Sequence, residues 1–420
     1  MRALATLCGA TLASALFAAC ATSEEDPQRK PPGGFADAAG GTGGVLDSGS
    51  DVGATDAPAD TGADAQPDAS ADASPDASAD ASGDAAQPDA SAGQLILVTR
   101  SATGLVLATR TAASAFSTQP IAQAALDTPA LTRTSSGALV VVRDPAAGEL
   151  RYATYAKAGA TLSPFAAVGT AGMTLGAPAL SESGTATLAF LGTDFKYYVN
   201  RYAGSWQGFA PVLAASLHSF GPAAPSVAAL PGTELVAYVG DDGKLYTQVA
   251  QAGSFQPAHA HATPALLDKA VTPSVVATVG PSPSFVLVYV EASTQRLLWT
   301  EGNASAWSTP APVSTTLTAV GAPALAPLSN GDAVLAFRAT DDRVRTSILS
   351  GGTWSAPLSP FPNSALSAPP AVAPGVGSQA ELAWISGGTL LSSSLSAGGW
   401  KAATTVLASA QQTVAMATIP

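Results

Sequence analysis

Residues 330–357, NGDAVLAFRATDDRVRTSILSGGTWSAP, contain the pattern that decides the fold. An alternating apolar run, AVLAFR, precedes a turn with two aspartates, a second alternating run follows, and a Gly-Gly turn leads to Trp354. Apolar residues at every second position are typical of β-strands, and short turns rich in Gly and Asp join neighbouring antiparallel strands. The stretch therefore predicts consecutive short strands connected by tight turns.

The same outline recurs in six complete units between residues 94 and 420, which indicates duplication of one unit. Each unit begins near a proline, and successive prolines are 47 to 50 residues apart. These prolines are Pro129, Pro178, Pro225, Pro273, Pro323 and Pro370. The fourth run of each unit opens with a bulky residue, namely Leu162, Trp206, Phe255, Trp307, Trp354 or Trp400. Four short strands per period of about 48 residues are typical of a β-propeller blade.

A seventh unit is split between the two ends of this region. Residues 94–127 contain LILVTR, LVLATR and AFSTQP, which match the second, third and fourth runs of a unit but lack the first. Residues 413–420, TVAMATIP, form a first run with no blade of its own. We therefore predict an all-β, seven-bladed β-propeller over residues 94–420. Its closing blade takes one strand from the C-terminus and three from the N-terminal side, which leaves no free sheet edge.

Residues 1–20 have the features of an export signal. A single basic residue, Arg2, precedes an apolar stretch that is too short to span a membrane, and two alanines stand before Cys20. The ending LFAAC resembles the lipobox of bacterial lipoproteins, with Phe17 where that family usually has Leu. The resemblance implies a lipid on Cys20 and, because Ala21 follows, an anchor in the outer membrane. An ordinary secretory signal cut nearby is the alternative.

Residues 21–93 have a different composition, dominated by Ala, Asp, Ser, Gly and Pro. Such a segment cannot bury enough apolar surface to offset its chain entropy, so we expect a disordered tether. It contains fifteen acidic and two basic residues, whereas residues 94–420 contain fifteen of each. The net charge of −12 is therefore a property of the tether and gives no indication of a nucleic-acid partner.

The repeats resemble those of bacterial seven-bladed propeller lectins. The stretches AFRATDDRVRTSILSGGTWSAP and AYVGDDGKLYTQVAQAGSFQPA carry this resemblance, through an Asp-containing turn and a Gly turn followed by an aromatic residue. It implies binding of simple sugars such as fucose in pockets between neighbouring blades. A fainter resemblance, to the Asp-box of sialidase-type propellers, is carried by SILSGGTW, which has Leu349 in place of the Asp. It implies a glycoside hydrolase as an alternative, and a protein-binding or structural envelope scaffold is the third.

Charged residues gather in the predicted turns between the second and third strands of each blade. In a propeller these turns share one face with the loops that join consecutive blades. Arg100, Arg143 and Arg338 fall there, in nearby blades. The resemblance to sialidases, which bind a carboxylate with three arginines, implies that role for them. Glu291 occupies a further turn of this kind. Solvated turn residues are the simpler interpretation, because Asp and its neighbours favour the turn itself.

The bulky residues that open the fourth runs have two possible roles. They could stack on sugar rings, or they could pack between blades, and their recurrence at one fixed position favours packing. Two consecutive units combine an aromatic with a charged residue: Arg338 with Trp354, and Glu291 with Trp307. We therefore expect the ligand at the interface shared by these two blades.

Catalytic and metal-binding signatures are weak throughout the predicted propeller. The loops between blades contain few ionisable residues, namely Asp127, His218, Asp268 and Lys269. Sugar hydrolysis typically needs two carboxylates about 5 to 10 Å apart, and these loops do not provide a convincing pair. His218 lies at a different height in its repeat from His259 and His261, which argues against a shared zinc ion. We expect no metal and no cofactor.

Overall fold

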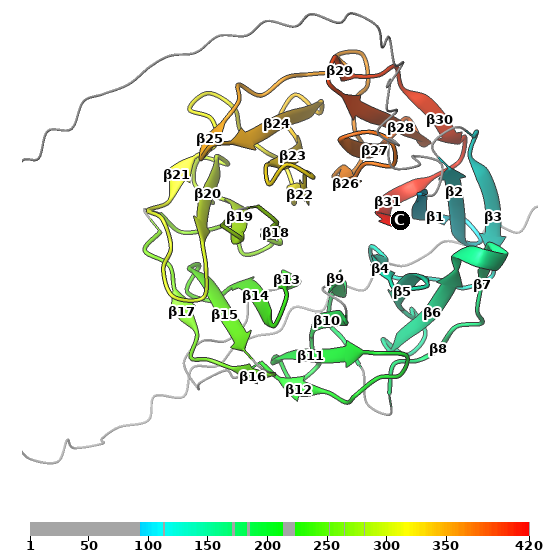
Figure 1. Ribbon diagram of the computed structural model, residues 1–420, viewed down its shortest axis with the longest axis horizontal. Coiled ribbons are helices and arrows are strands. Elements are labelled where there is room, and N and C mark those ends of the chain that lie inside the picture. Colours follow the sequence, from blue (N-terminus) through cyan, green and yellow to red (C-terminus); the bar gives the residue numbers. More distant parts are fainter. Residues whose placement is uncertain are drawn as a thin grey trace, which may run out of the picture. The chain divides into compact units, whose positions relative to one another are not determined.

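The computed structural model describes residues 93–111, 114–169, 173–182, 185–212, 223–251, 253–263, 265–280 and 282–419. They belong to a compact unit, Ala81–Pro420, in which seven antiparallel sheets form a ring around a common axis (Figure 1). The predicted all-β seven-bladed propeller is thus confirmed. The predicted export signal, Cys20 and residues 21–92 of the predicted tether lie outside the described residues. Within the described part, no helix has the length and apolar character that a membrane span requires.

Blades 1 to 3 follow one another along the chain. Blade 1 contains β4 (Ala130–Thr134), β5 (Gly137–Arg143), β6 (Leu150–Ala156), the 3-10 helix η1 (Lys157–Gly159), β7 (Thr161–Leu162) and β8 (Ala166–Ala167). Blade 2 contains β9 (Ala179–Glu182), β10 (Ala186–Leu191), β11 (Tyr197–Tyr202) and β12 (Ala210–Pro211). Blade 3 contains β13 (Ser226–Leu230), β14 (Thr233–Val239), β15 (Leu245–Gln251), β16 (Ser254–Phe255) and β17 (His259–Ala260).

Blades 4 to 6 repeat this order. Blade 4 contains β18 (Ser274–Thr278), β19 (Ser284–Val290), β20 (Leu297–Gly302) and β21 (Ala311–Pro312). Blade 5 contains β22 (Ala324–Pro327), β23 (Ala333–Arg338), β24 (Val344–Ser350) and β25 (Thr353–Trp354). Blade 6 contains β26 (Ala371–Pro374), β27 (Ala380–Ser386), β28 (Thr389–Ser396), β29 (Gly399–Trp400) and β30 (Thr404–Leu407).

The closing blade joins the two ends of the domain, as the split unit predicts. It contains β1 (Gln94–Ser101), β2 (Gly104–Thr111), β3 (Ser117–Ile121) and β31 (Gln411–Ile419), in the order β3-β2-β1-β31. In its register Gln94 is opposite Ile419 and Val98 is opposite Ala415. The C-terminal strand is therefore the inner strand of this blade, next to the axis of the ring (Figure 1).

The repeated prolines mark where the inner strands begin. In each of blades 1 to 6 the inner strand starts at the residue that follows the repeated proline, for example Ala130 after Pro129 and Ala324 after Pro323. A proline has no N–H to donate to a strand partner, so it suits the position just before a strand. The second strands are buried on both faces, because each blade packs against two neighbours; all seven residues of β19 are buried.

The connections between blades fasten each blade to the next. Thr318, in the connection from blade 4 to blade 5, forms a bridge to Arg296 of blade 4, and the adjacent Ala319 bridges Ala339 of blade 5. The connections therefore share one face of the ring with the turns between second and third strands, as predicted. We call this face the connection face. The opposite face holds the turns between first and second strands.

The turn aspartates stabilise their own turns. Asp194, Asp242 and Asp341 each accept a hydrogen bond from the backbone N–H two residues later. Asp194 and Asp242 also accept from the hydroxyl of a tyrosine in the following strand, at 2.7 and 2.8 Å. The interpretation of these aspartates as turn residues is thus confirmed.

Candidate ligand-binding site

The three predicted binding arginines lie on the connection face but do not converge. Arg100 donates a hydrogen bond to the carbonyl oxygen of Leu126 at 2.8 Å, and Arg143 donates to that of Leu175 at 2.9 Å. Both acceptors belong to connections that lead to the next blade. Arg143 also forms an ion pair with Asp127 at 2.9 Å. These two guanidinium groups therefore hold the connections in place.

Arg338 and Trp354 face opposite sides of blade 5. Phe337 packs with residues of blade 4, so the next residue along the strand, Arg338, points away from blade 4. Its guanidinium forms an ion pair with Asp342 of the same turn at 2.6 Å. Trp354 packs toward blade 4, where its ring lies edge-on to Trp299 at 5.9 Å.

Glu291 and Trp307 are likewise held apart. Glu291 accepts hydrogen bonds from Thr294 and Arg296 of its own turn, and these contacts hold the pKa of its carboxyl group below the ordinary value. Trp307 lies against His261 of blade 3, with ring centroids 4.8 Å apart. Of the four residues expected at the interface of blades 4 and 5, Trp354 alone packs there, because strand alternation sends neighbouring side chains to opposite faces. Their roles in ligand binding stay predictions.

The bulky residues of the fourth strands pack between blades. Each is partly buried and belongs to an apolar cluster of the core: Leu162, Trp206, Phe255, Trp307, Trp354 and Trp400. In one such cluster the Trp206 ring lies 5.5 Å from the Tyr152 ring of the preceding blade, in an edge-on arrangement. The packing interpretation is thus the one that the structure shows.

A polar pocket that the sequence did not reveal lies between blade 6 and the closing blade. It has a volume of about 170 Å³, and its lining includes Arg110, Ser378, Ser394, Lys401 and Thr404. Arg110 belongs to β2 of the closing blade, whereas the other four residues belong to blade 6. The pocket therefore exists only because the two ends of the domain meet.

Glu381 is buried behind this pocket and contacts three of its lining residues. Its side chain is fully buried and accepts hydrogen bonds from the hydroxyl groups of Ser378 and Ser394 at 2.9 Å. Arg110 pairs with the same carboxylate at 2.8 Å. The guanidinium also lies over the ring of Phe116, 4.8 Å from its centroid. A buried carboxylate needs such partners, because an unpaired charge in the interior costs several kcal/mol.

The guanidinium of Arg110 makes its contacts to Glu381 and Ser394 through one nitrogen. Its Nε atom is buried and has no hydrogen-bond partner among the described residues. The side chain as a whole is 14% exposed, so it reaches solvent at the pocket. The lining of the pocket thus combines two basic side chains and several hydroxyl groups, with the carboxylate of Glu381 buried behind them, and it can exchange hydrogen bonds with a polar ligand. A sequence signal for it exists: Glu381 opens the run ELAWI, in which its neighbours are apolar.

A second arginine–glutamate pair joins blades 2 and 3. Arg201 of β11 contacts both carboxylate oxygens of Glu234 in β14, with Nε 2.9 Å from each and a second nitrogen at 2.6 Å. Thr187 donates a further hydrogen bond to Glu234 at 2.7 Å. The bond to Glu234 raises the pKa of Arg201 above its ordinary value. Both oxygens of this carboxylate are thus engaged by the guanidinium and the threonine.

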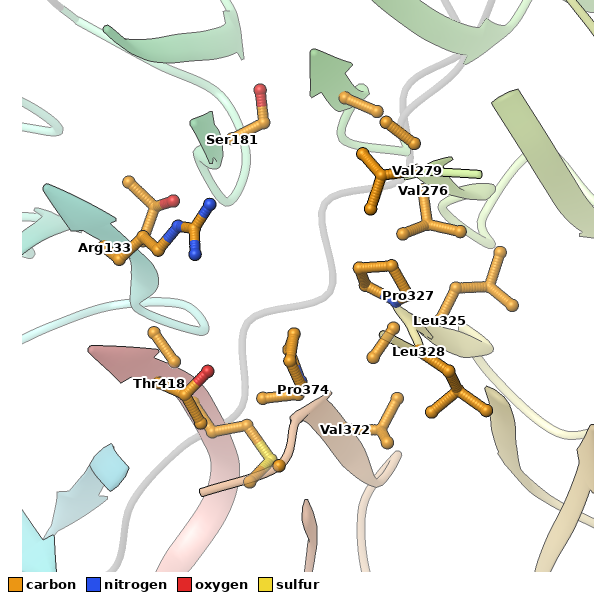
Figure 2. Close-up of a pocket in the computed structure, with 18 of the residues that line it drawn as sticks. Arg133, Ser181, Val276, Val279, Leu325, Pro327, Leu328, Val372, Pro374 and Thr418 are labelled. Atoms are coloured by element: carbon orange, nitrogen blue, oxygen red, sulfur yellow. The ribbon is translucent and has the colours of Figure 1, made fainter. Parts of the chain in front are cut away.

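A larger cavity of about 450 Å³ lies at the axis of the ring (Figure 2). All seven inner strands contribute to its lining. Among the described residues that line it, Arg133 is the one arginine, and neither tyrosine nor carboxylate is present. The groups that a sialidase-like reaction requires are therefore not assembled in this part of the described structure.

The histidines do not form a metal site in the described part of the chain. His218 lies outside the described residues. His261 is buried and contacts the hydroxyl group of Thr247 through Nε2 at 2.9 Å. Burial, together with the nearby His259, lowers the pKa of His261 to about 4. No cluster of three or more potential metal-ligating side chains occurs among the residues described.

Comparisons with known proteins bear on the fold. No protein-family model matches the chain, and no curated protein is significantly similar to it. The solved structure of the BP39L lectin from Burkholderia pseudomallei superposes with a TM-score of 0.63 at 18% identity, over 74% of this chain and 95% of that protein. AofleA from Arthrobotrys oligospora gives 0.49 at 15% identity, over 69% and 88% of the two chains. The six-bladed lectin of Aleuria aurantia gives 0.44 at 14% identity, over 67% and 96%. The likeness to BP39L shows a shared propeller fold.

Proposed function

We propose that this propeller binds carbohydrate and that the pocket between blade 6 and the closing blade is a binding site. The observation that carries the proposal is the lining of this pocket, where the Arg110 guanidinium, paired with the buried Glu381, lies with Lys401 and several hydroxyl groups. A sugar ring presents adjacent hydroxyl groups that both donate and accept hydrogen bonds. The basic groups of the lining can donate hydrogen bonds, and its serine and threonine hydroxyls can both donate and accept them.

The size of the pocket favours a single sugar ring. Pockets that enclose drug-sized ligands measure about 300 to 1,000 Å³, and this one measures about 170 Å³. A single polar site of this kind binds weakly, so tight attachment to a glycan surface requires several copies of the protein or several sites. That BP39L, which shares the fold, is a lectin supports the proposal.

A glycan array with the full-length protein tests the proposal. We expect wild-type protein to bind a defined set of monosaccharide-terminated glycans, and we expect Arg110→Ala to lose at least about tenfold in signal, because the pocket loses its guanidinium group. Arg201→Ala is the matched control, since it removes the arginine of the closed pair and should keep the binding. Thermal unfolding of each variant separates lost binding from lost folding.

Two outcomes would contradict this assignment. An array without any bound glycan would favour the scaffold alternative. Binding that survives Arg110→Ala but disappears in Arg338→Ala combined with Glu291→Ala would move the site to the connection face, as the sequence analysis predicts.

We further propose that the propeller is held at the outer membrane by a lipid on Cys20. The LFAAC ending of the export signal supports this, and Ala21 is compatible with outer-membrane sorting. In the Cys20→Ser variant we expect protein that is released from membranes or remains unprocessed. Mass spectrometry of the mature N-terminus checks the modification, and a mature protein without a lipid on Cys20 would overturn the proposal.

A further inference from the structure

The pocket between blade 6 and the closing blade carries a positive charge that no neighbouring group balances. Among the described residues that line it, Arg110 and Lys401 alone have a formal charge. The charge of Arg110 is balanced by Glu381, which is fully buried behind the lining and lies 2.8 Å away. Lys401 is exposed and forms no ion pair with any described residue. The pocket therefore presents one net positive charge to a ligand.

Two hydrogen bonds hold the backbone of Lys401 beside the pocket. Its N–H group donates to the carbonyl oxygen of Ser394 at 2.9 Å, and its own carbonyl oxygen accepts from the hydroxyl group of Ser393 at 2.7 Å. Both serines belong to β28, and Ser393 is buried. The base of the lysine side chain is thus fixed, while its flexible four-carbon stem lets the ammonium group adjust to a ligand.

The serine hydroxyl groups of the pocket have already committed their protons. Ser378 and Ser394 donate to the carboxylate of Glu381, and Ser393 donates to the backbone of Lys401. A hydroxyl group has a single proton to donate. While these bonds persist, the donors that remain for a ligand are mainly cationic N–H groups. Such a lining suits a ligand group that only accepts hydrogen bonds, and a carboxylate, with two oxygens and no proton, is a group of that kind.

We infer that this pocket prefers a sugar that carries a carboxylate to the corresponding neutral sugar. The inference rests on the carbohydrate binding proposed above and names the class of sugar. The carboxylate pairs with Lys401 through charge-assisted hydrogen bonds, which are stronger than those between neutral groups. The ring hydroxyl groups bind Arg110 and the serine oxygens. A hexuronic acid differs from its hexose only in a carboxylate that replaces a CH₂OH group, so the pocket distinguishes the two by charge and not by size.

Isothermal titration calorimetry of the full-length protein with matched pairs of sugars tests this inference. The pairs are glucuronate with glucose, galacturonate with galactose, and mannuronate with mannose. In every pair that binds, we expect the acid to bind at least about fivefold more tightly, because a hydrogen bond between charged groups contributes more than a neutral one. The preference should decrease as the salt concentration rises, because salt screens exposed charges.

Three lysine variants separate the charge of the pocket from the charge of the whole protein. Lys401→Gln should reduce the affinity for the acid to that for the neutral sugar, whereas Lys401→Arg keeps the positive charge and should keep the preference. Lys196→Gln is the matched control, because it removes the same charge from an exposed lysine in a turn of blade 2 and should leave the preference unchanged. Both lysines are exposed, so we expect the variants to fold, and circular dichroism checks this.

The outcomes distinguish this inference from the proposed function. Neutral sugars that bind as tightly as their acids, with binding lost in Arg110→Ala, would overturn the inference and leave the proposed function standing. A preference for the acid that persists in folded Lys401→Gln would also overturn it, because the carboxylate would then bind elsewhere. A wild-type protein that binds no sugar would overturn both.

Discussion

Two interfaces of the ring place an arginine of one blade beside a glutamate of its neighbour, with opposite results. Between blades 2 and 3, Arg201 engages both oxygens of Glu234, and Thr187 adds a third donor. Between blade 6 and the closing blade, serine hydroxyls also bind the carboxylate of Glu381, and Arg110 contacts it through one nitrogen and lines a pocket. The same two residue types thus form a closed clamp in one place and an open site in another.

The difference begins with the face of the strand that carries the glutamate. Leu235, next to Glu234, packs with blade 4, so Glu234 points back toward blade 2. Leu382, next to Glu381, packs with blade 5, so that glutamate points forward to the closing blade. A shift of one residue along a strand moves a side chain to the other face. Such a shift therefore decides which neighbour supplies the partner and what else surrounds the carboxylate.

Removal of the C-terminal strand, which belongs to the closing blade, should have the largest effect on stability. Deletion of residues 413–420 takes away most of β31, exposes one edge of β1 and uncovers apolar residues of two neighbouring blades. We expect the free energy of unfolding to fall by several kcal/mol, with loss of glycan binding and a tendency to aggregate. Chemical denaturation measures the change. An unchanged midpoint would show that the closing blade contributes little to stability.

The second-largest effects should come from removal of each glutamate, and their sizes should differ between the two interfaces. Glu381→Ala removes a fully buried carboxylate and leaves Arg110 and two serines without their acceptor, so we expect a loss of about 4 kcal/mol. Glu234→Ala affects a pair that is 16 to 21% exposed, and we expect about 1 to 2 kcal/mol. Equilibrium unfolding in urea compares the two variants. Equal losses of unfolding free energy in the two variants would mean that the deeper burial of Glu381 does not make its pair more important for stability.

A third interface can be compared through its sensitivity to acid, because His261 of blade 3 packs against Trp307 of blade 4 and forms no ion pair with any described residue. An unfolded histidine takes up a proton near pH 6.5, whereas burial lowers the pKa of His261 to about 4 in the folded domain. As the pH falls from 6.5 to about 4, the unfolded state alone gains this proton, and stability decreases by up to about 3 kcal/mol. His261→Gln should remove this dependence, whereas His259→Gln, which removes only the smaller cause of the shift, should reduce it slightly. Identical pH profiles for both variants would refute the assignment.

Replacement of the arginines by lysine should have the smallest effect. Arg201→Lys loses a two-point contact that an ammonium group cannot reproduce, so we expect about 1 kcal/mol of destabilisation. Arg110→Lys keeps the short contact to Glu381 and loses the longer one to Ser394, so we expect about 0.5 kcal/mol of destabilisation. Thermal and chemical unfolding measure both. A larger loss for Arg110→Lys would show that its geometry is as demanding as that of Arg201.

Much of the fold was readable from the sequence because its signals are local and repeated. The prolines before Ala130 and Ala324 predict where inner strands begin. The unpaired strand-like run at residues 413–420 predicts the closing blade. The pocket was not readable, because Arg110 and Ser394 are 284 residues apart and meet only through the closure of the ring. Which face Glu381 occupies depends on strand register, which a repeat pattern does not specify.

The two ends of the ring are neighbours in space. Gln94 lies opposite Ile419, and a Cβ atom on Gly93 would lie 3.5 Å from the carbonyl oxygen of Ile419. Chain ends that lie this close make a circular permutation possible: a short linker could join residue 419 to residue 93, and the chain could be opened at the exposed Gly351 and Gly352 turn. In that permutant blade 6 and the closing blade follow one another, and Glu381, Ser394 and Arg110 belong to one continuous stretch of polypeptide.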